Sequence, residues 1–130
     1  MAEHPNAVLC RKGFAAFAGG DMATLNELFA DDIVWHSSGR SFLAGDFVGK
    51  EAVFGNFARL AQETDSFKQE IHTILADDEH AIALVTATPS RAGRTAAMRQ
   101  HITFHIAGGK VQEVWLSSFD QYAADEFWAH

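Results

Sequence analysis

The sequence predicts an α+β domain in which helices pack on one face of an antiparallel sheet. Two amphipathic segments come first, a strand and a third amphipathic segment follow, and the second half consists of alternating strands joined by short turns. Runs of helices followed by runs of strands are typical of this class. A long twisted sheet that curls around three N-terminal helices forms a cone, and such an interior is a natural ligand site.

Length and charge limit the functions to consider. The 130 residues suffice for one domain, 1–130, with a core of its own. The net charge of −7 argues against nucleic acid and anionic membranes as partners. No apolar signal core or membrane span is present, which predicts a soluble, cytoplasmic protein. The single cysteine, Cys10, lies among apolar helical neighbours, as expected of a structural thiol.

Three segments have helical periodicity. Pro5 suits a first turn, and the helix that follows ends at Gly19 and Gly20. Asp21 can cap a short second helix, and a third is expected from about residue 50 to 64. The apolar faces comprise Cys10, Phe14 and Phe17, then Met22, Leu25, Leu28 and Phe29, then Val53, Phe57, Leu60 and Ala61.

Strands are expected at 33–38, 67–76 and 80–88, and in a hairpin formed by residues 98–106 and 111–120. Turns are expected at 31–32, 77–79 and 89–93, and Gly108 and Gly109 provide the positive φ angles of the hairpin turn. Residues 39–49 read as a loop with a short extended piece. The last ten residues are expected to form a helical turn or a clasp over the sheet.

Period-two alternation assigns the strand residues to two faces. The inner face is predicted to line a pocket through Trp35, Ser37, Gln100, Ile102, Phe104, Val114, Leu116 and Ser118, with Asp120 at its end. A few hydroxyls and amides in an apolar cavity orient a ligand. The alternative for these residues is ordinary core packing, with Gln100 hydrogen-bonded to backbone.

The outer face carries an apolar stripe formed by Val111, Trp115 and Phe119. Exposed apolar stripes mark interfaces, so we expect a homodimer through this face. The alternative is that the C-terminal segment covers the stripe with Phe127 and Trp128.

The order of elements and four segments resemble the nuclear-transport-factor-2-like superfamily, whose cystatin-like α+β barrel is shared by ketosteroid isomerase, limonene epoxide hydrolase and SnoaL-like polyketide cyclases. The segments are AAFAGGDMATLNELFADDIVWH, LAGDFVGKEAVFGNF, LADDEHAIALV and GGKVQEVWLSSFDQY. The closing DQYAADEFW resembles the SnoaL-like cyclases specifically.

The resemblance excludes two chemistries. The positions of the isomerase's tyrosine and two aspartates hold Gly13, Ser37 and Ile102 here. The final-strand aspartate of the epoxide hydrolases corresponds to Leu116, and residues 80–88 contain neither arginine nor aspartate. SnoaL-like cyclases move a proton next to a carbonyl with a pocket aspartate and a nearby histidine, without metal or cofactor.

Asp120 and His36 are the candidates for that proton transfer. An apolar wall around Asp120 would raise the pKa of its carboxyl and suit it to acid/base work. The alternatives are that Asp120 caps the turn after it and that His36, which lies on the opposite side of its strand from Trp35, points outward.

No metal site is predicted. His101 and His105 are four residues apart on a strand, which separates them by about 13 Å at about 3.3 Å per residue.

Three functions follow from these observations. The first is a cofactor-independent cyclase or isomerase for an apolar carbonyl compound. The second is a non-catalytic binding protein for an apolar metabolite in the same pocket. The third is an interaction module that works through the outer face.

Overall fold

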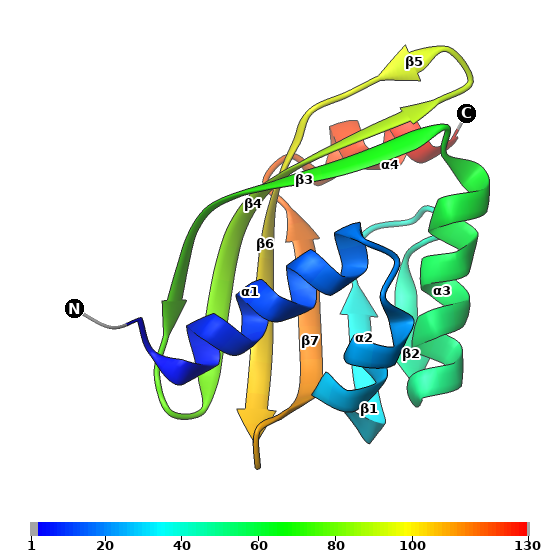
Figure 1. Cartoon of the computed structure of the whole chain (residues 1–130). Helices are drawn as coiled ribbons and strands as arrows, with labels where there is room; N and C mark the ends of the chain where they lie inside the picture. The colour runs from blue at the N-terminus through cyan, green and yellow to red at the C-terminus, as the bar shows by residue number, and fades with distance from the viewer. Residues whose placement is uncertain (1–2, 130) are drawn as a thin grey trace.

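The computed structural model describes residues 3–129, so residues 1, 2 and 130 of the predicted domain 1–130 lie outside the described part. The predicted order of helices and strands is confirmed (Figure 1). No helix within residues 3–129 is long and apolar enough to cross a membrane. The elements are α1 (Pro5–Ala18), α2 (Met22–Leu28), β1 (Phe29–Ser37), β2 (Gly45–Val48), α3 (Lys50–Glu63), β3 (Ser66–Ala76), β4 (His80–Arg91), β5 (Arg94–Thr95), β6 (Met98–Ala107), β7 (Lys110–Ser118) and α4 (Gln121–Ala129).

The strands form one curved sheet in the order β2-β1-β7-β6-β4-β3, with β5 paired to β4. Every neighbouring pair is antiparallel except β1 and β7, which run parallel. The predicted antiparallel sheet is therefore wrong at this one pair. A hairpin forces its two strands to be antiparallel, but β1 and β7 are separated by most of the chain and no turn sets their direction.

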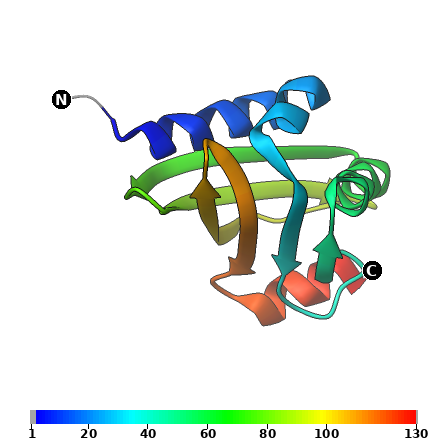
Figure 2. The ribbon, with the colours of Figure 1, turned by 90° about the horizontal axis from the view of Figure 1, so that it is seen from below.

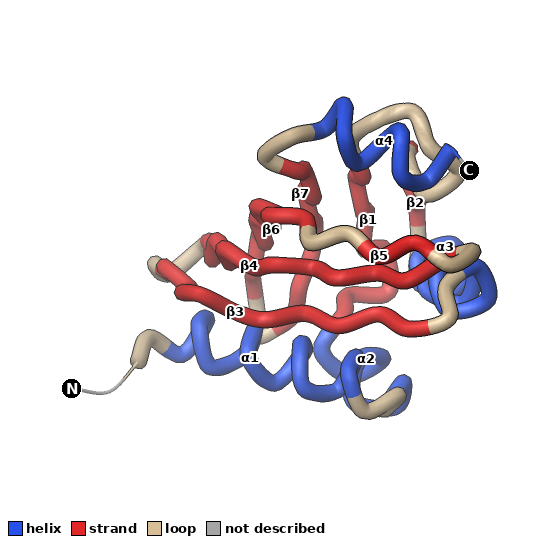
Figure 3. The backbone as a smooth tube through the Cα atoms, turned by 90° about the horizontal axis from the view of Figure 1, so that it is seen from above, coloured by secondary structure: helices blue, strands red, loops and turns tan. Residues whose placement is uncertain are grey.

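Helices α1, α2 and α3 pack on the inner face of the sheet. Helix α1 contacts β3 and β4, α2 contacts β1 and β7, and α3 contacts β1 and β2. Viewed along the vertical axis of Figure 1, α4 lies at the ends of β7 and β1, on the opposite side of the molecule from α1 and α2 (Figures 2 and 3). The main apolar core lies between the first three helices and the sheet.

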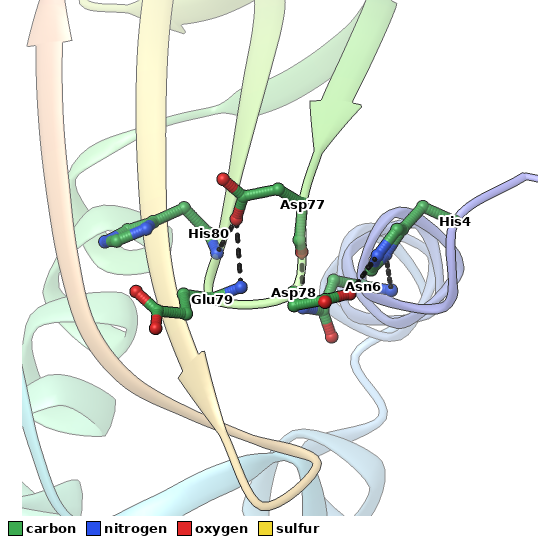
Figure 4. Close-up of polar contacts among 6 residues, drawn as sticks. All are labelled: His4, Asn6, Asp77, Asp78, Glu79 and His80. Carbon is green, nitrogen blue, oxygen red and sulfur yellow. Dashed lines mark hydrogen bonds and ion pairs between the residues drawn. The ribbon is translucent and has the colours of Figure 1, made fainter.

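The N-terminal end of α1 is tied to the turn between β3 and β4 (Figure 4). The His4 Nδ1 atom accepts a hydrogen bond from the backbone N–H of Asn6 at 3.0 Å and so caps the helix. The His4 Nε2 atom lies 3.0 Å from Asp78 Oδ1, and the Asn6 side chain donates to the Asp77 carbonyl at 2.8 Å. The Asp77 carboxylate in turn accepts from the backbone N–H groups of Glu79 and His80, which fixes the turn.

Helix α4 is held by arginines that donate to its last carbonyls. Arg91 donates to the carbonyl of Trp128 at 2.8 Å, and Arg94 donates to that of Phe127 at 3.2 Å. Cations are favourable at a helix C-terminus, where the carbonyls are otherwise unpaired. Phe127 and Trp128 are buried with Met98 in a second apolar cluster. The C-terminal segment is thus a helix that closes one end of the cone.

Several boundaries differ from the sequence prediction. β1 begins at Phe29 rather than residue 33, and Asp31 and Asp32, predicted as a turn, are exposed strand residues next to a shift in the pairing of β1 with β7. β4 continues through Pro89 to Arg91 and is followed by the unpredicted β5. Pro89 pairs with Phe67 on β3, and the pairing of β4 with β6 ends at Ala87, so no partner there needs the N–H that proline lacks.

A register shift in the hairpin reassigns Val111. His105 pairs with Glu113 but Ile106 pairs with Val111, so Gln112 is an extra residue in β7. Because one extra residue moves the preceding side chain to the other face, Val111 is buried inside and is not part of the outer stripe. On α3, Ala61 is exposed rather than inward.

Candidate functional site

A cavity lies between the helices and the inner face of the sheet. Its volume, as the space open to the centre of a water molecule, is about 140 Å³. Every helix contributes to its wall, together with β1, β3, β6 and β7 and the loop before β2. The lining includes Cys10, Gly13, Phe14, Leu28, Phe29, Trp35, Ser37, Ser41, Asn56, Phe57, Phe67, Gln69, Gln100, Ile102, Phe104, Val111, Leu116, Ser118 and Gln121.

The polarity of the sheet wall changes in rows across the strands. Gln100 on β6 faces Ser118 on β7 at one end. The next row inward holds Ile102 and Leu116, with Ser37 beside Leu116 on β1.

Two further rows are apolar. They comprise Phe104, Val114 and Trp35, followed by Ile106, Val111 and Phe29. The wall therefore has a polar end near α4 and an apolar end near α1 and α2.

Seven of the eight predicted wall residues line this cavity: Trp35, Ser37, Gln100, Ile102, Phe104, Leu116 and Ser118. Val114, the eighth, is fully buried, but it packs in the core and is not part of the lining. Alternation along the strands was sufficient to choose the face, because it fixes which side chains share one surface. Their contact with a ligand remains a prediction.

No charged side chain is among the described residues that line the cavity. The polar groups there are hydroxyls of serine and amides of asparagine and glutamine. Cys10 is the one lining residue with a titratable side chain, and burial raises the pKa of its thiol to about 12. The thiol therefore stays protonated near neutral pH and is a poor nucleophile.

Sequence reasoning missed five polar residues of the wall, which are Ser38, Ser41, Asn56, Gln69 and Gln121. Asn56 on α3 falls on the inward stripe between Val53 and Phe57, and Gln69 on β3 alternates with the inward Phe67. The signal that could have identified these two residues is a polar side chain at a position whose neighbours on the same face are apolar. The helix positions of the lining were predicted only as core, because periodicity does not distinguish a packed interior from a hollow one.

An open groove adjoins the cavity between α1, α3 and β3. Its volume, in the same measure, is about 830 Å³, and it shares six wall residues with the cavity, Phe14, Phe17, Phe57, Leu60, Phe67 and Gln69. The Phe17 ring meets those of Phe57 and Phe67 edge to face, with centroids 5.1 and 6.1 Å apart. With Phe14, which also lines both spaces, four aromatic rings lie in the wall between the groove and the cavity.

Asp120 does not line the cavity. It is exposed, and its Oδ1 atom accepts a hydrogen bond from the backbone N–H of Ala123 at 3.1 Å. This is the geometry of a helix N-cap, here at the start of α4. The expectation that Asp120 ends the inner wall is wrong because β7 stops at Ser118, two residues earlier.

His36 lies on the outer face, away from the cavity. Its Nδ1 atom is 2.6 Å from Asp46 on β2, and its Nε2 atom is 2.6 Å from Glu113 on β7. Its ring stacks on that of Trp115, with centroids 5.7 Å apart. Two hydrogen bonds raise the pKa of His36 above its ordinary value; the one to Asp46 has the larger effect and the one to Glu113 the smaller. Because carboxylates only accept, both ring nitrogens must carry protons, so this geometry is that of an imidazolium.

The outer stripe is not covered by the C-terminal helix. Phe127 and Trp128 are buried in a separate cluster with Met98 and Ala124, while Trp115 and Phe119 stay exposed, so the alternative based on them is wrong. Trp115 is 40% exposed and Phe119 is 74% exposed. The homodimer through this face remains a prediction.

A family model described as the SnoaL-like domain matches residues 10–114 of the chain. The chain belongs to the SnoaL-like family. The match runs from the middle of α1 to the middle of β7, so it covers most of the cavity wall but not the end of β7 or α4.

The chain is also similar over nearly its whole length to two other proteins. The uncharacterized protein Rv0034 of Mycobacterium tuberculosis is 32% identical over 131 residues, with 99% of this chain and 100% of the relative covered. The solved structure of Bal32a, from a soil-derived mobile gene cassette, is 40% identical, with a TM-score of 0.91 and 95% and 96% of the two chains covered.

An NTF2-like protein of unknown function from Burkholderia pseudomallei is 16% identical, with a TM-score of 0.89 and coverage of 98% and 100%. It shows the shared fold alone.

The capping role of Asp120 predicts a stability effect. We expect Asp120→Ala to lower the free energy of unfolding by about 1 kcal/mol, because the first turn of α4 loses its side-chain acceptor. Asp120→Asn is the matched control, because asparagine caps about as well, and we expect a change of only a few tenths of a kcal/mol. Chemical denaturation measures both, and equal losses in the two variants would contradict the capping role.

The His36 contacts predict a pH dependence of stability. A pKa raised in the folded state stabilises the fold below the ordinary value of 6.5, and this contribution is lost as the pH rises through the folded pKa. We expect wild type to exceed His36→Gln in free energy of unfolding by more at about pH 6 than at about pH 9.

The matched control for this test is His72→Gln. The His72 ring bonds the Thr86 hydroxyl at 2.8 Å, and a hydroxyl can donate or accept, so that bond needs no charged imidazole. We expect the control to follow the wild-type pH profile. The same profile in His36→Gln would contradict the imidazolium bridge.

The exposed stripe predicts that Trp115→Glu changes the oligomeric state. If the outer face joins two copies, a buried carboxylate there weakens the dimer. Analytical ultracentrifugation should show a dimer for wild type and a monomer for the variant, with Leu75→Glu, at an exposed site on β3, as the control. A monomeric wild type would remove the prediction.

Proposed function

We propose that this protein binds a small, mostly apolar molecule in the cavity and holds it without acid/base chemistry. The observation that carries the proposal is the neutral lining, in which hydroxyls and amides accompany apolar side chains and no carboxylate, imidazole or ammonium group is present among the described residues. Ligand sites of this kind use a few polar groups to orient the bound molecule.

The adjoining groove supports a route of entry. A ligand entering from the groove has to move phenylalanine rings that line both spaces, which are those of Phe14, Phe17, Phe57 and Phe67. Side-chain and loop motions are faster than the hinge motions of domains. Entry therefore needs no rearrangement of the sheet.

The cyclase or isomerase predicted from the sequence has less support. A general acid or base must come within hydrogen-bonding reach of the reacting atom. Asp120 caps α4 and His36 is bonded to two carboxylates on the outer face, so neither candidate adjoins the cavity. If wild type converts a carbonyl compound and Asp120→Asn does not, the enzyme hypothesis would be supported again.

We expect a cavity-filling substitution to abolish binding. Gly13 lies within α1 and lines the cavity, and a Cβ atom added there would meet Leu28 at an ordinary 3.8 Å. Gly13→Leu therefore fits the helix and places its remaining carbons in the hollow. Thermal shift with a panel of neutral monocyclic compounds should stabilise wild type and leave Gly13→Leu unchanged.

The matched control is Gly55→Leu. Gly55 lies within α3, is exposed, and has nothing within 4 Å of an added Cβ. Both substitutions replace a helical glycine by a good helix former, so both favour the helix to a similar degree. Ligand-induced stabilisation should persist in Gly55→Leu. Equal stabilisation of both variants by the same ligand would locate binding outside the cavity and refute the proposal.

A further inference from the structure

The Gln100 side chain lines the cavity and carries a buried oxygen, Oε1, that has no hydrogen-bond partner in the described part of the chain. It is the one such side-chain atom found within residues 3–129. Ser118 lies directly opposite on β7 but does not pair with this oxygen. Buried acceptors are normally satisfied, and an orphan at a ligand site is most simply completed by the ligand.

We propose that the ligand is a neutral, single-ring-sized alcohol or phenol whose hydroxyl group pairs with the Gln100 amide. This inference rests on the proposed binding function and specifies its ligand. A hydroxyl both donates and accepts, so it can donate to the amide oxygen or accept from the amide nitrogen. A rotation of the amide by 180° exchanges these two atoms, and the hydroxyl satisfies either arrangement.

The size of the cavity sets the size of the ligand body. A cavity of about 150 Å³ lined by aliphatic and aromatic side chains binds benzene in another protein. The cavity here is about 140 Å³ in the same kind of measure, which fits one ring. Fused three- or four-ring compounds exceed it without expansion into the groove.

The polarity of the wall sets the orientation of the ligand. Gln100, Ser118 and Ser37 occupy the polar end, and the rows beyond them are apolar. The hydroxyl therefore lies toward α4 and the ring toward α1. A charged ligand is disfavoured because no counter-charge is present among the described lining residues, and burying an unpaired charge is costly.

The test compares two probes of nearly equal shape, 4-methylphenol and 1,4-dimethylbenzene, which differ by a hydroxyl in place of a methyl group. Titration calorimetry gives the ratio of their dissociation constants for wild type and for Gln100→Leu. In wild type the Gln100 amide pairs with the hydroxyl of 4-methylphenol but is left unpaired by the methyl group of 1,4-dimethylbenzene, so wild type should prefer the phenol. Gln100→Leu has no amide, and we expect this preference to fall on the order of tenfold in the variant. An unchanged ratio overturns the inference.

Two controls make the result specific. Gln62→Leu makes the same chemical change at an exposed glutamine of α3 that lines neither the cavity nor the groove, and its ratio should stay at the wild-type value. Gln100→Met tests the site with an unbranched apolar side chain in case leucine impairs folding, and it should also lose the preference.

The two proposals fail in different ways. If wild type binds both probes and Gln100→Leu leaves the ratio of their dissociation constants unchanged, Gln100 has no role in recognition and the proposed binding function stands. Failure of wild type to bind either probe removes both.

Discussion

The cavity depends on one packing constraint. Helix α1 covers the apolar inner face of a curved sheet, but the side chains that it points toward the sheet at the cavity are small and leave space unfilled. Cys10 and Gly13 are the small residues of α1 that line the hollow. The contacts of His4 and Asn6 with the β3–β4 turn fix one end of the helix across the sheet. A helix held in this way cannot collapse onto the sheet to fill the space that its glycine leaves.

The fold was predictable because its signals are local. Alternation assigned Trp35 and Leu116 to one surface, and the glycine pair at 108–109 gave the hairpin turn. The parallel pairing of β1 with β7 was missed because it joins distant segments and leaves no local signal. Val111 was misassigned because a single inserted residue reverses the faces of a strand without changing its composition.

The site was predictable in its lining but not in its chemistry. Alternation along the strands identified Ser37, Gln100 and Ser118 but missed Asn56 and Gln69. Asp120 lies outside the lining because β7 ends two residues before it. The two alternatives weighed for Asp120 and His36, a cap and an outward histidine, are the arrangements found. Family membership alone does not assign a reaction to this chain, since a shared fold hosts unrelated functions.

The central claim is that a neutral cavity within the cone receives the ligand. Methyl-labelled NMR during titration with 4-methylphenol tests it most directly, because methyl shifts report which side chains the ligand approaches. The account predicts changes at Leu28, Ile102 and Leu116, which line the cavity, with little change at the exposed Leu75 on β3. Changes confined to the outer surface, or none at saturating phenol, would contradict it.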